Sequence, residues 1–135
     1  MVTDLEKRVL VVEDFTTMAH IICSLLTKIG FKRVDHVNDV STALAKLRAG
    51  SYGLVLSDWN MEPISGLAFL KEVRTDPALK NTPFIMMTTN ARRENVIAAR
   101  KAGVDNYIVK PFTAATLREK IDAVFSLTAG PWRTN

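Results

Sequence analysis

The chain has 135 residues, 47% of them hydrophobic, which is enough for one ordinary domain to build its own apolar core without disulfides or metals. Its apolar runs are shorter than the ~20 residues that cross a bilayer, and its mixed-charge start predicts a cytoplasmic protein with no signal peptide or membrane insertion. The net charge of +4 favours acidic partners but is too diffuse to indicate a nucleic-acid binder.

In chain order, short runs of branched apolar residues alternate with apolar residues at helical spacing. The predicted strands lie at 9–12, 34–37, 54–56, 84–87 and 107–109. The predicted helices lie at 18–29, 40–47, 67–73, 92–102 and 117–125, of which the fourth has the weakest apolar face. Because parallel strands need helical crossovers of about this length, the pattern predicts a doubly wound α/β fold with a five-stranded parallel sheet and five helices.

No linker or repeat divides the sequence, so we expect one domain over residues 1–135, with a core at about 7–127 and a short tail at 128–135. The tail is too short for an effector domain. Any output is therefore expected to pass through a partner protein.

Polar side chains follow four of the strands at their carboxyl ends, where open parallel sheets bind ligands. They are Glu13 and Asp14 after the first strand, Asp58 after the third, Thr88 and Thr89 after the fourth, and Lys110, followed by Pro111, after the fifth. Taken singly, such residues often cap helices or lie in solvent. Taken together, three carboxylates at one edge repel one another unless a cation neutralises them, so the sequence predicts a cation site.

The predicted ligands are oxygen atoms, which fits Mg²⁺ with room for waters and a phosphate oxygen. The Lys110 ammonium and the Thr88 hydroxyl are then suited to hold the oxygens of a transferred phosphoryl group. Asp58 is the predicted acceptor, because the flanking acids can hold the metal while its second oxygen attacks to form an acyl phosphate.

Six segments, in order along the chain, make this interpretation specific: VVEDFTTM at 11–18, DWNM at 58–61, GL at 66–67, MTT at 87–89, GVD at 103–105 and VKPF at 109–112. Together they resemble the receiver domain of bacterial two-component response regulators, of the stand-alone, CheY-like chemotaxis type. The resemblance spans nearly the whole chain. It implies a flavodoxin-like, CheY-like fold with strand order 2-1-3-4-5, a histidine kinase as phosphodonor, and a downstream target such as a flagellar motor switch component, and it allows for a phosphatase.

By the same resemblance, Asp58 is the phosphoacceptor and, with Asp14, a direct ligand of Mg²⁺. The backbone carbonyl of Asn60 also binds the ion, and Glu13 reaches it through a water molecule. A protein of this kind is a switch that catalyses only its own phosphorylation and dephosphorylation, and is not an enzyme acting on other substrates.

The resemblance also assigns the switch. Thr88 and Lys110 contact the phosphoryl oxygens, and Tyr107 is the aromatic whose rotamer follows activation by turning inward. The Lys110-Pro111 bond is expected to be cis, which aims the ammonium into the site. The output surface is expected on the fourth helix, fifth strand and fifth helix, near Arg92, Val96, Ala99 and Arg118.

The chain departs from the family pattern at 60–63, which reads NMEP, so that the proline stands one position later than usual. We interpret Glu62 as a solvated loop residue, with a partner contact as the alternative. Asn60 and Asn90 flank the path of the hydrolytic water in such domains, and their polar side chains leave the rate of self-dephosphorylation open.

The remaining candidates have structural or surface interpretations. Cys23, His20 and His36 fall in predicted helix or strand and are assigned no function. The basic residues of the fourth helix are interpreted as a solvated face, with an acidic peptide or nucleotide as the alternative ligand: Arg92, Arg93, Arg100 and Lys101.

Two enzyme or cofactor classes compete with the receiver interpretation. A haloacid-dehalogenase-type phosphatase also forms an aspartyl phosphate, but its D-x-D motif follows the first strand, where this chain reads Glu13-Asp14-Phe15-Thr16. A flavodoxin-like FMN binder needs a hydroxyl-rich phosphate loop there, and the two acids would repel phosphate. Within the receiver class, a motor-binding regulator, a phosphate sink and an adaptor in another pathway stay open.

Overall fold

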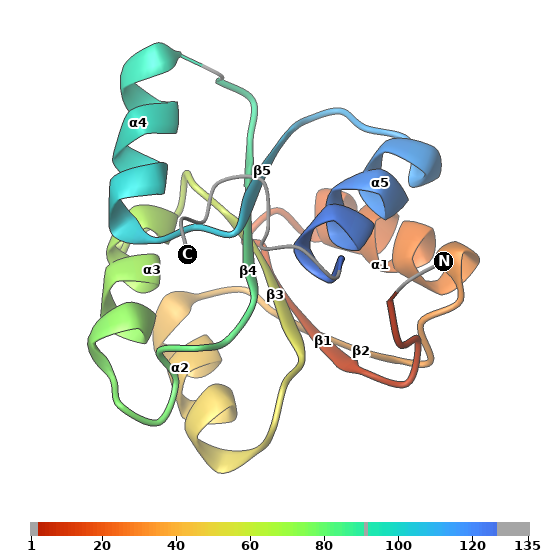
Figure 1. The fold of residues 1–135 in the computed structure, drawn as a ribbon, viewed down its shortest axis with the longest axis horizontal. Helices are drawn as coiled ribbons and strands as arrows, with labels where there is room; N and C mark the ends of the chain where they lie inside the picture. The colour runs from red at the N-terminus through yellow and green to blue at the C-terminus, as the bar shows by residue number, and fades with distance from the viewer. Residues whose placement is uncertain (1–2, 91, 127–135) are drawn as a thin grey trace.

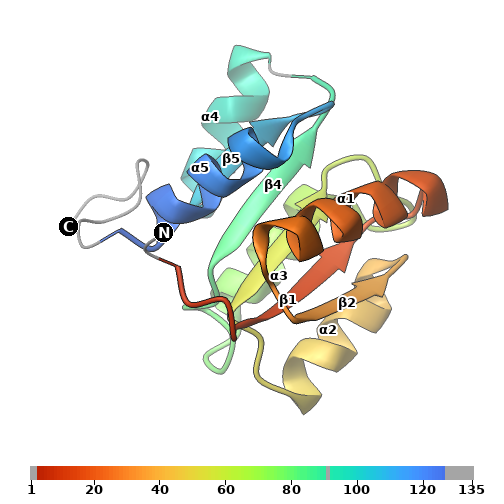
Figure 2. The same cartoon turned by 90° about the vertical axis from the view of Figure 1, so that its right-hand side faces the viewer.

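The computed structural model describes residues 3–90 and 92–126, so the predicted tail at 128–135 lies outside the described residues. A five-stranded parallel sheet forms the middle layer, and helices pack against both of its faces (Figure 1, Figure 2). The strands are β1 (Arg8–Val12), β2 (Arg33–Val37), β3 (Leu54–Asp58), β4 (Phe84–Thr88) and β5 (Asn106–Val109). The helices are α1 (Thr16–Ile29), α2 (Val40–Ala49), α3 (Gly66–Thr75), α4 (Arg93–Ala102) and α5 (Ala114–Val124).

The strands lie in the order β2-β1-β3-β4-β5, which confirms the predicted doubly wound α/β fold. Each neighbouring pair is parallel. From β1 the chain first builds outward to β2 and then crosses back to β3, so the strand order reverses between β1 and β3. Ligands bind at such a reversal, at the carboxyl ends of the strands.

The core lies in two layers, one on each side of the sheet. Figure 1 shows α1 and α5 on one side and α2, α3 and α4 on the other. Successive side chains of a strand point to opposite faces, so Val9 and Val11 pack with the α1 and α5 layer while Leu10 and Val12 pack with the other. All five residues of β3 and of β4 are buried, as expected for central strands covered on both faces.

Polar side chains begin three of the five helices. Asp39, Ser65 and Thr113 each accept a hydrogen bond from the backbone N–H three residues later. The predicted fourth helix is one residue shorter than expected: it begins at Arg93, and Arg92 is its extended N-cap without a side-chain bond. Among the described helices, none is long and apolar enough to span a membrane.

Arg74, in the last turn of α3, joins α3 to the chain around β4 and β5. Its guanidinium donates to the Asp105 carboxylate at 2.9 Å and to three backbone carbonyls, those of Lys80, Thr82 and Gly103. The same Asp105 oxygen accepts from the backbone N–H of Phe84 at 2.8 Å. The side chains of Arg74 and Asp105 are only 15% and 2% exposed, so this is a buried ion pair with its hydrogen bonds filled.

Gly66 marks a close approach between α3 and the chain that leaves β3. Its N–H donates to the Trp59 carbonyl at 2.9 Å, and a Cβ atom at this position would overlap the Asp58 carbonyl oxygen. Only glycine fits this contact without moving the backbone. The glycine at this position therefore has a steric reason.

Candidate functional site

The predicted site residues meet at the carboxyl edge of the sheet. Glu13 and Asp14 follow β1, Asp58 and Thr88 are the last residues of β3 and β4, and Lys110 follows β5. Because the strands are parallel, these ends lie at one edge. The predicted convergence is therefore present in the fold, and Asp58 and Thr88 are held by the sheet itself.

Lys110 lies between two carboxylates. Its Nζ is 2.6 Å from Glu13 Oε1 and 3.0 Å from Asp58 Oδ1. The three side chains are 7%, 1% and 8% exposed, so water screens these contacts weakly. The Lys110-Pro111 peptide bond is cis, as expected.

The ionisation of this cluster follows from burial and charge. Burial raises the pKa of Glu13 and the Asp58 charge adds to this, while the hydrogen bond from Lys110 opposes it; the net direction is upward. Burial alone would lower the pKa of Lys110, but its bonds to Glu13 and Asp58 outweigh burial and raise the pKa above its usual value. The ammonium is therefore held in its charged form.

Glu13, Asp14 and Asp58 form a group that could hold a metal ion. One carboxylate oxygen from each lies within 4.8 Å of the others, and Asp14 is the exposed member, so the cluster opens to solvent on that side. An all-oxygen donor set with an open side fits a hard divalent cation such as Mg²⁺. Asn60 is exposed in the loop after β3, and its carbonyl as a ligand stays a prediction.

Thr88 and Tyr107 are joined through the backbone of Asn90. The Thr88 hydroxyl accepts from the Asn90 N–H at 3.0 Å, and the Tyr107 hydroxyl donates to the Asn90 carbonyl at 2.9 Å. Tyr107 is 4% exposed, so the ring already points inward, with Trp59 at 6.5 Å in an edge arrangement. Burial raises the pKa of Tyr107, against a smaller opposing effect from the Thr88 hydroxyl. The sequence predicted the Thr88 and Tyr107 pair but not the bridge.

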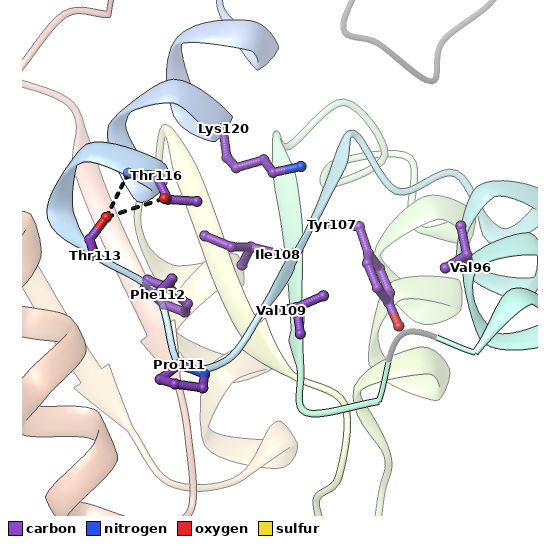
Figure 3. Close-up of a pocket in the computed structure, with 9 residues that line it drawn as sticks. All are labelled: Val96, Tyr107, Ile108, Val109, Pro111, Phe112, Thr113, Thr116 and Lys120. Atoms are coloured by element: carbon purple, nitrogen blue, oxygen red, sulfur yellow. Dashed lines mark hydrogen bonds between the residues drawn. The ribbon is translucent and has the colours of Figure 1, made fainter.

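A groove of about 390 Å³ lies on the face built by α4, β5 and α5. Figure 3 shows it between Val96 of α4 and Lys120 of α5, with Tyr107, Ile108 and Val109 of β5 along it. Val109 is 43% exposed, which is high for a branched apolar residue of a strand. One predicted surface residue is wrong: Ala99 is fully buried because it packs into the core under α4, whereas Arg92 and Arg118 are exposed.

The minor candidates lie where the sequence suggested. Glu62 and His20 are exposed, and burial raises the pKa of the partly covered Cys23 thiol. The four basic residues of the fourth helix region are exposed: Arg92, Arg93, Arg100 and Lys101.

His36 has a contact that the sequence did not predict. Its Nε2 lies 2.8 Å from the backbone carbonyl of Glu13, so a side chain of β2 reaches the site residues that follow β1. The strand pattern placed His36 on β2, but the spacing of apolar residues carries no signal for a contact across two strands.

Comparison with known proteins agrees with this geometry. The family description Response regulator receiver domain matches residues 9–122. Chemotaxis protein CheY-3 of Vibrio cholerae is 47% identical over 118 residues, which cover 87% of this chain and 91% of that protein.

Solved structures show the same likeness. Chemotaxis response regulator CheY4 of Vibrio cholerae has a TM-score of 0.81 at 30% identity and covers 88% of this chain and 98% of its own. The receiver domain of sensor histidine kinase PA1611 from Pseudomonas aeruginosa has a TM-score of 0.80 at 26% identity, and the match covers 89% of this chain and 98% of that one. That structure has a magnesium ion coordinated in its active-site cleft. The chain is therefore a member of the response regulator receiver domain family, and a CheY-like one.

Proposed function

We propose that this chain is a phosphoacceptor switch in which Asp58 takes a phosphoryl group from the phosphohistidine of a histidine kinase. The observation that carries the proposal is the cluster at the strand reversal, where Lys110 lies 3.0 Å from Asp58 beside two further carboxylates. Asp14, Asp58 and the Asn60 carbonyl would bind Mg²⁺ directly, and Glu13 would reach it through water.

In the proposed step a carboxylate oxygen of Asp58 attacks phosphorus, and the N–P bond of the donor breaks with its electron pair left on the imidazole nitrogen. A Mg²⁺ ion held by these residues would supply positive charge that offsets the charge on the transferred oxygens. The Lys110 ammonium, which the buried acids keep charged, binds one of these oxygens, and the Thr88 hydroxyl donates to another. The product is an acyl phosphate on Asp58.

The switch transmits this event through Thr88. When the Thr88 hydroxyl turns to the phosphoryl group, it gives up its hydrogen bond with the Asn90 N–H. The carbonyl of the same residue accepts a hydrogen bond from the Tyr107 hydroxyl. A change at Asn90 therefore changes the hydrogen bond that holds Tyr107 in its inward position, beside the groove of α4, β5 and α5. Charge-assisted hydrogen bonds to a phosphoryl group can shift such an equilibrium by a few kcal/mol.

The chain is proposed to act in the cytoplasm, with a histidine kinase as phosphodonor and a downstream target, such as a flagellar motor switch component, that docks in this groove; a phosphatase can reset the switch. The chemotaxis proteins among its relatives support this output. A pull-down that compares the phosphorylated chain with Asp58→Ala separates this output from a phosphate sink, which would retain no target.

Labelling with acetyl phosphate and Mg²⁺ tests the acceptor, with the mass of the intact chain as the readout. We expect the parent to gain one phosphoryl group and Asp58→Asn to gain none, because Glu13, the other cluster acid that contacts Lys110, has a side chain only 1% exposed and is proposed to act on the metal only through water. Asp39→Asn is the matched control, because asparagine also caps helices and Asp39 is not a member of the metal-binding group. Equal labelling of the parent and Asp58→Asn overturns the proposal.

Fluorescence tests the metal site. Mg²⁺ should quench the fluorescence of Trp59, the residue that follows the proposed ligand Asp58. The measurement uses a Trp132→Phe background, which removes the other tryptophan of the chain. Trp132 lies outside the described residues. Asp14→Ala should abolish the saturable change. A parent signal that stays flat through millimolar Mg²⁺ counts against the site.

A further inference from the structure

The backbone of Glu13 lies just beyond the regular pairing of β1 with β2. The last pair in that ladder joins Val12 and Val37, and the Glu13 N–H donates to the Val37 carbonyl at 3.1 Å. The Glu13 carbonyl oxygen then lies 2.8 Å from Nε2 of His36. A carbonyl can only accept, so Nε2 carries the proton of this hydrogen bond.

That carbonyl belongs to the peptide unit between Glu13 and Asp14, two of the three carboxylate residues of the cluster. A planar peptide turns as one body, so a bond to its oxygen fixes the direction in which the chain enters Asp14. The Glu13 carboxylate has its own contacts, to Lys110 at 2.6 Å and to the Phe15 N–H at 3.4 Å. The Asp14 side chain is exposed, so its position depends mainly on the backbone that carries it.

We propose that His36 is a positioning residue for the Mg²⁺ site: its ring N–H holds the peptide that joins Glu13 to Asp14 and so sets the place of the Asp14 carboxylate. This inference rests on the proposed function, because it assigns His36 a role only through that metal site. Groups that orient metal ligands without touching the ion typically change metal affinity 10- to 100-fold when they are lost. Since His36 acts on the backbone and not on a ligand atom, we expect about tenfold, the lower end.

A purely structural role predicts a different pattern. His36 is half-buried on the edge strand β2, so its ring could simply cover apolar surface there. An apolar replacement of similar size would then be tolerated. Glutamine separates the two roles, because its side-chain N–H can take the place of Nε2 while its shape differs from a ring.

The test is Mg²⁺ titration of the whole chain by isothermal titration calorimetry, for the parent, His36→Leu and His36→Gln. We expect His36→Leu to weaken Mg²⁺ binding about tenfold and His36→Gln to stay within about threefold of the parent. His20→Leu is the matched control, the same chemical change at an exposed position of α1, and should bind as the parent does. Thermal unfolding checks that each variant folds, and His36→Met replaces His36→Leu if the latter does not.

If His36→Leu binds Mg²⁺ with the affinity of the parent, the proposed role of His36 is overturned. It is also overturned if His36→Leu and His36→Gln lose the same affinity, because the imidazole ring itself, and not its N–H, would then be required. A parent that binds no Mg²⁺ removes the proposed function and this inference together. A parent that binds the ion while His36→Leu also binds it unchanged removes the inference alone.

Discussion

Replacing Lys110 by methionine should make the stability of the protein depend strongly on Mg²⁺. The ammonium lies 2.6 Å from Glu13 and 3.0 Å from Asp58, and at an effective permittivity of about 20 each attraction is about 6 kcal/mol before desolvation is counted. Burying the three groups takes back much of this. Removing one partner of a buried ion pair typically costs about 3–5 kcal/mol, because the other charge is left uncompensated.

We therefore expect Lys110→Met to lower the free energy of unfolding by about 3–5 kcal/mol in buffer with a chelator. In saturating Mg²⁺ the loss should shrink, since an ion that binds only the folded chain stabilises it and replaces the missing positive charge. The assay is urea unfolding with and without Mg²⁺. Lys32→Met is the control: its pair with Glu6 is 71% and 56% exposed and should matter by at most about 1 kcal/mol. A loss for Lys110→Met that is no larger than the control, or that Mg²⁺ leaves unchanged, would refute this reasoning.

Three further changes test other parts of the molecule. Asp14→Asn relieves repulsion among the carboxylates, so without Mg²⁺ its free energy of urea unfolding should exceed that of the parent by up to about 1 kcal/mol. In saturating Mg²⁺ the parent should be the more stable of the two, and the same order of stability in both buffers would contradict this. Thr88→Ala and Tyr107→Ala should still form a beryllofluoride complex yet gain less target affinity from it than the parent, and a full gain in both variants would exclude the route through Asn90. Arg74→Ala should lower the free energy of urea unfolding by about 3–5 kcal/mol, because it leaves Asp105 buried without its partner. Arg48→Ala, whose side chain is 51% exposed, should lower it by about 0–1 kcal/mol, and equal losses would show that the buried pair has no special role.

The sequence predicted the fold and the meeting of the site residues because both depend on regular patterns. Strands covered on both faces appear as continuous apolar runs, and in a parallel sheet the residues after such runs must share one edge. That rule alone brought Glu13, Asp58 and Lys110 together. The strand order came from the family resemblance, and the structure has the same order.

Other features depend on contacts that no periodicity encodes. The bond from His36 to Glu13 joins side chain and backbone across two strands, and the guanidinium of Arg74 reaches three carbonyls in two separate connections, α3–β4 and α4–β5. Ala99 was named with the output surface but is buried, because it lies on the apolar face of α4 that packs into the core. Tyr107 was placed correctly on β5, but its rotamer is set by the Asn90 carbonyl and not by its own neighbours in sequence.

The contact at Gly66 divides the loop after Asp58 into parts with different freedom to change. Both ends are fixed, one by the sheet and the other by a glycine that touches the backbone of Asp58 and Trp59, while Glu62 and Pro63 between them lie exposed. Substitutions in the middle can therefore alter what the loop presents to another protein without displacing the acceptor. For engineering, residues 62–63 are therefore positions where substitutions can change which protein the switch binds. At Gly66, in contrast, even one added methyl group would push against the backbone of Asp58 and displace the acceptor.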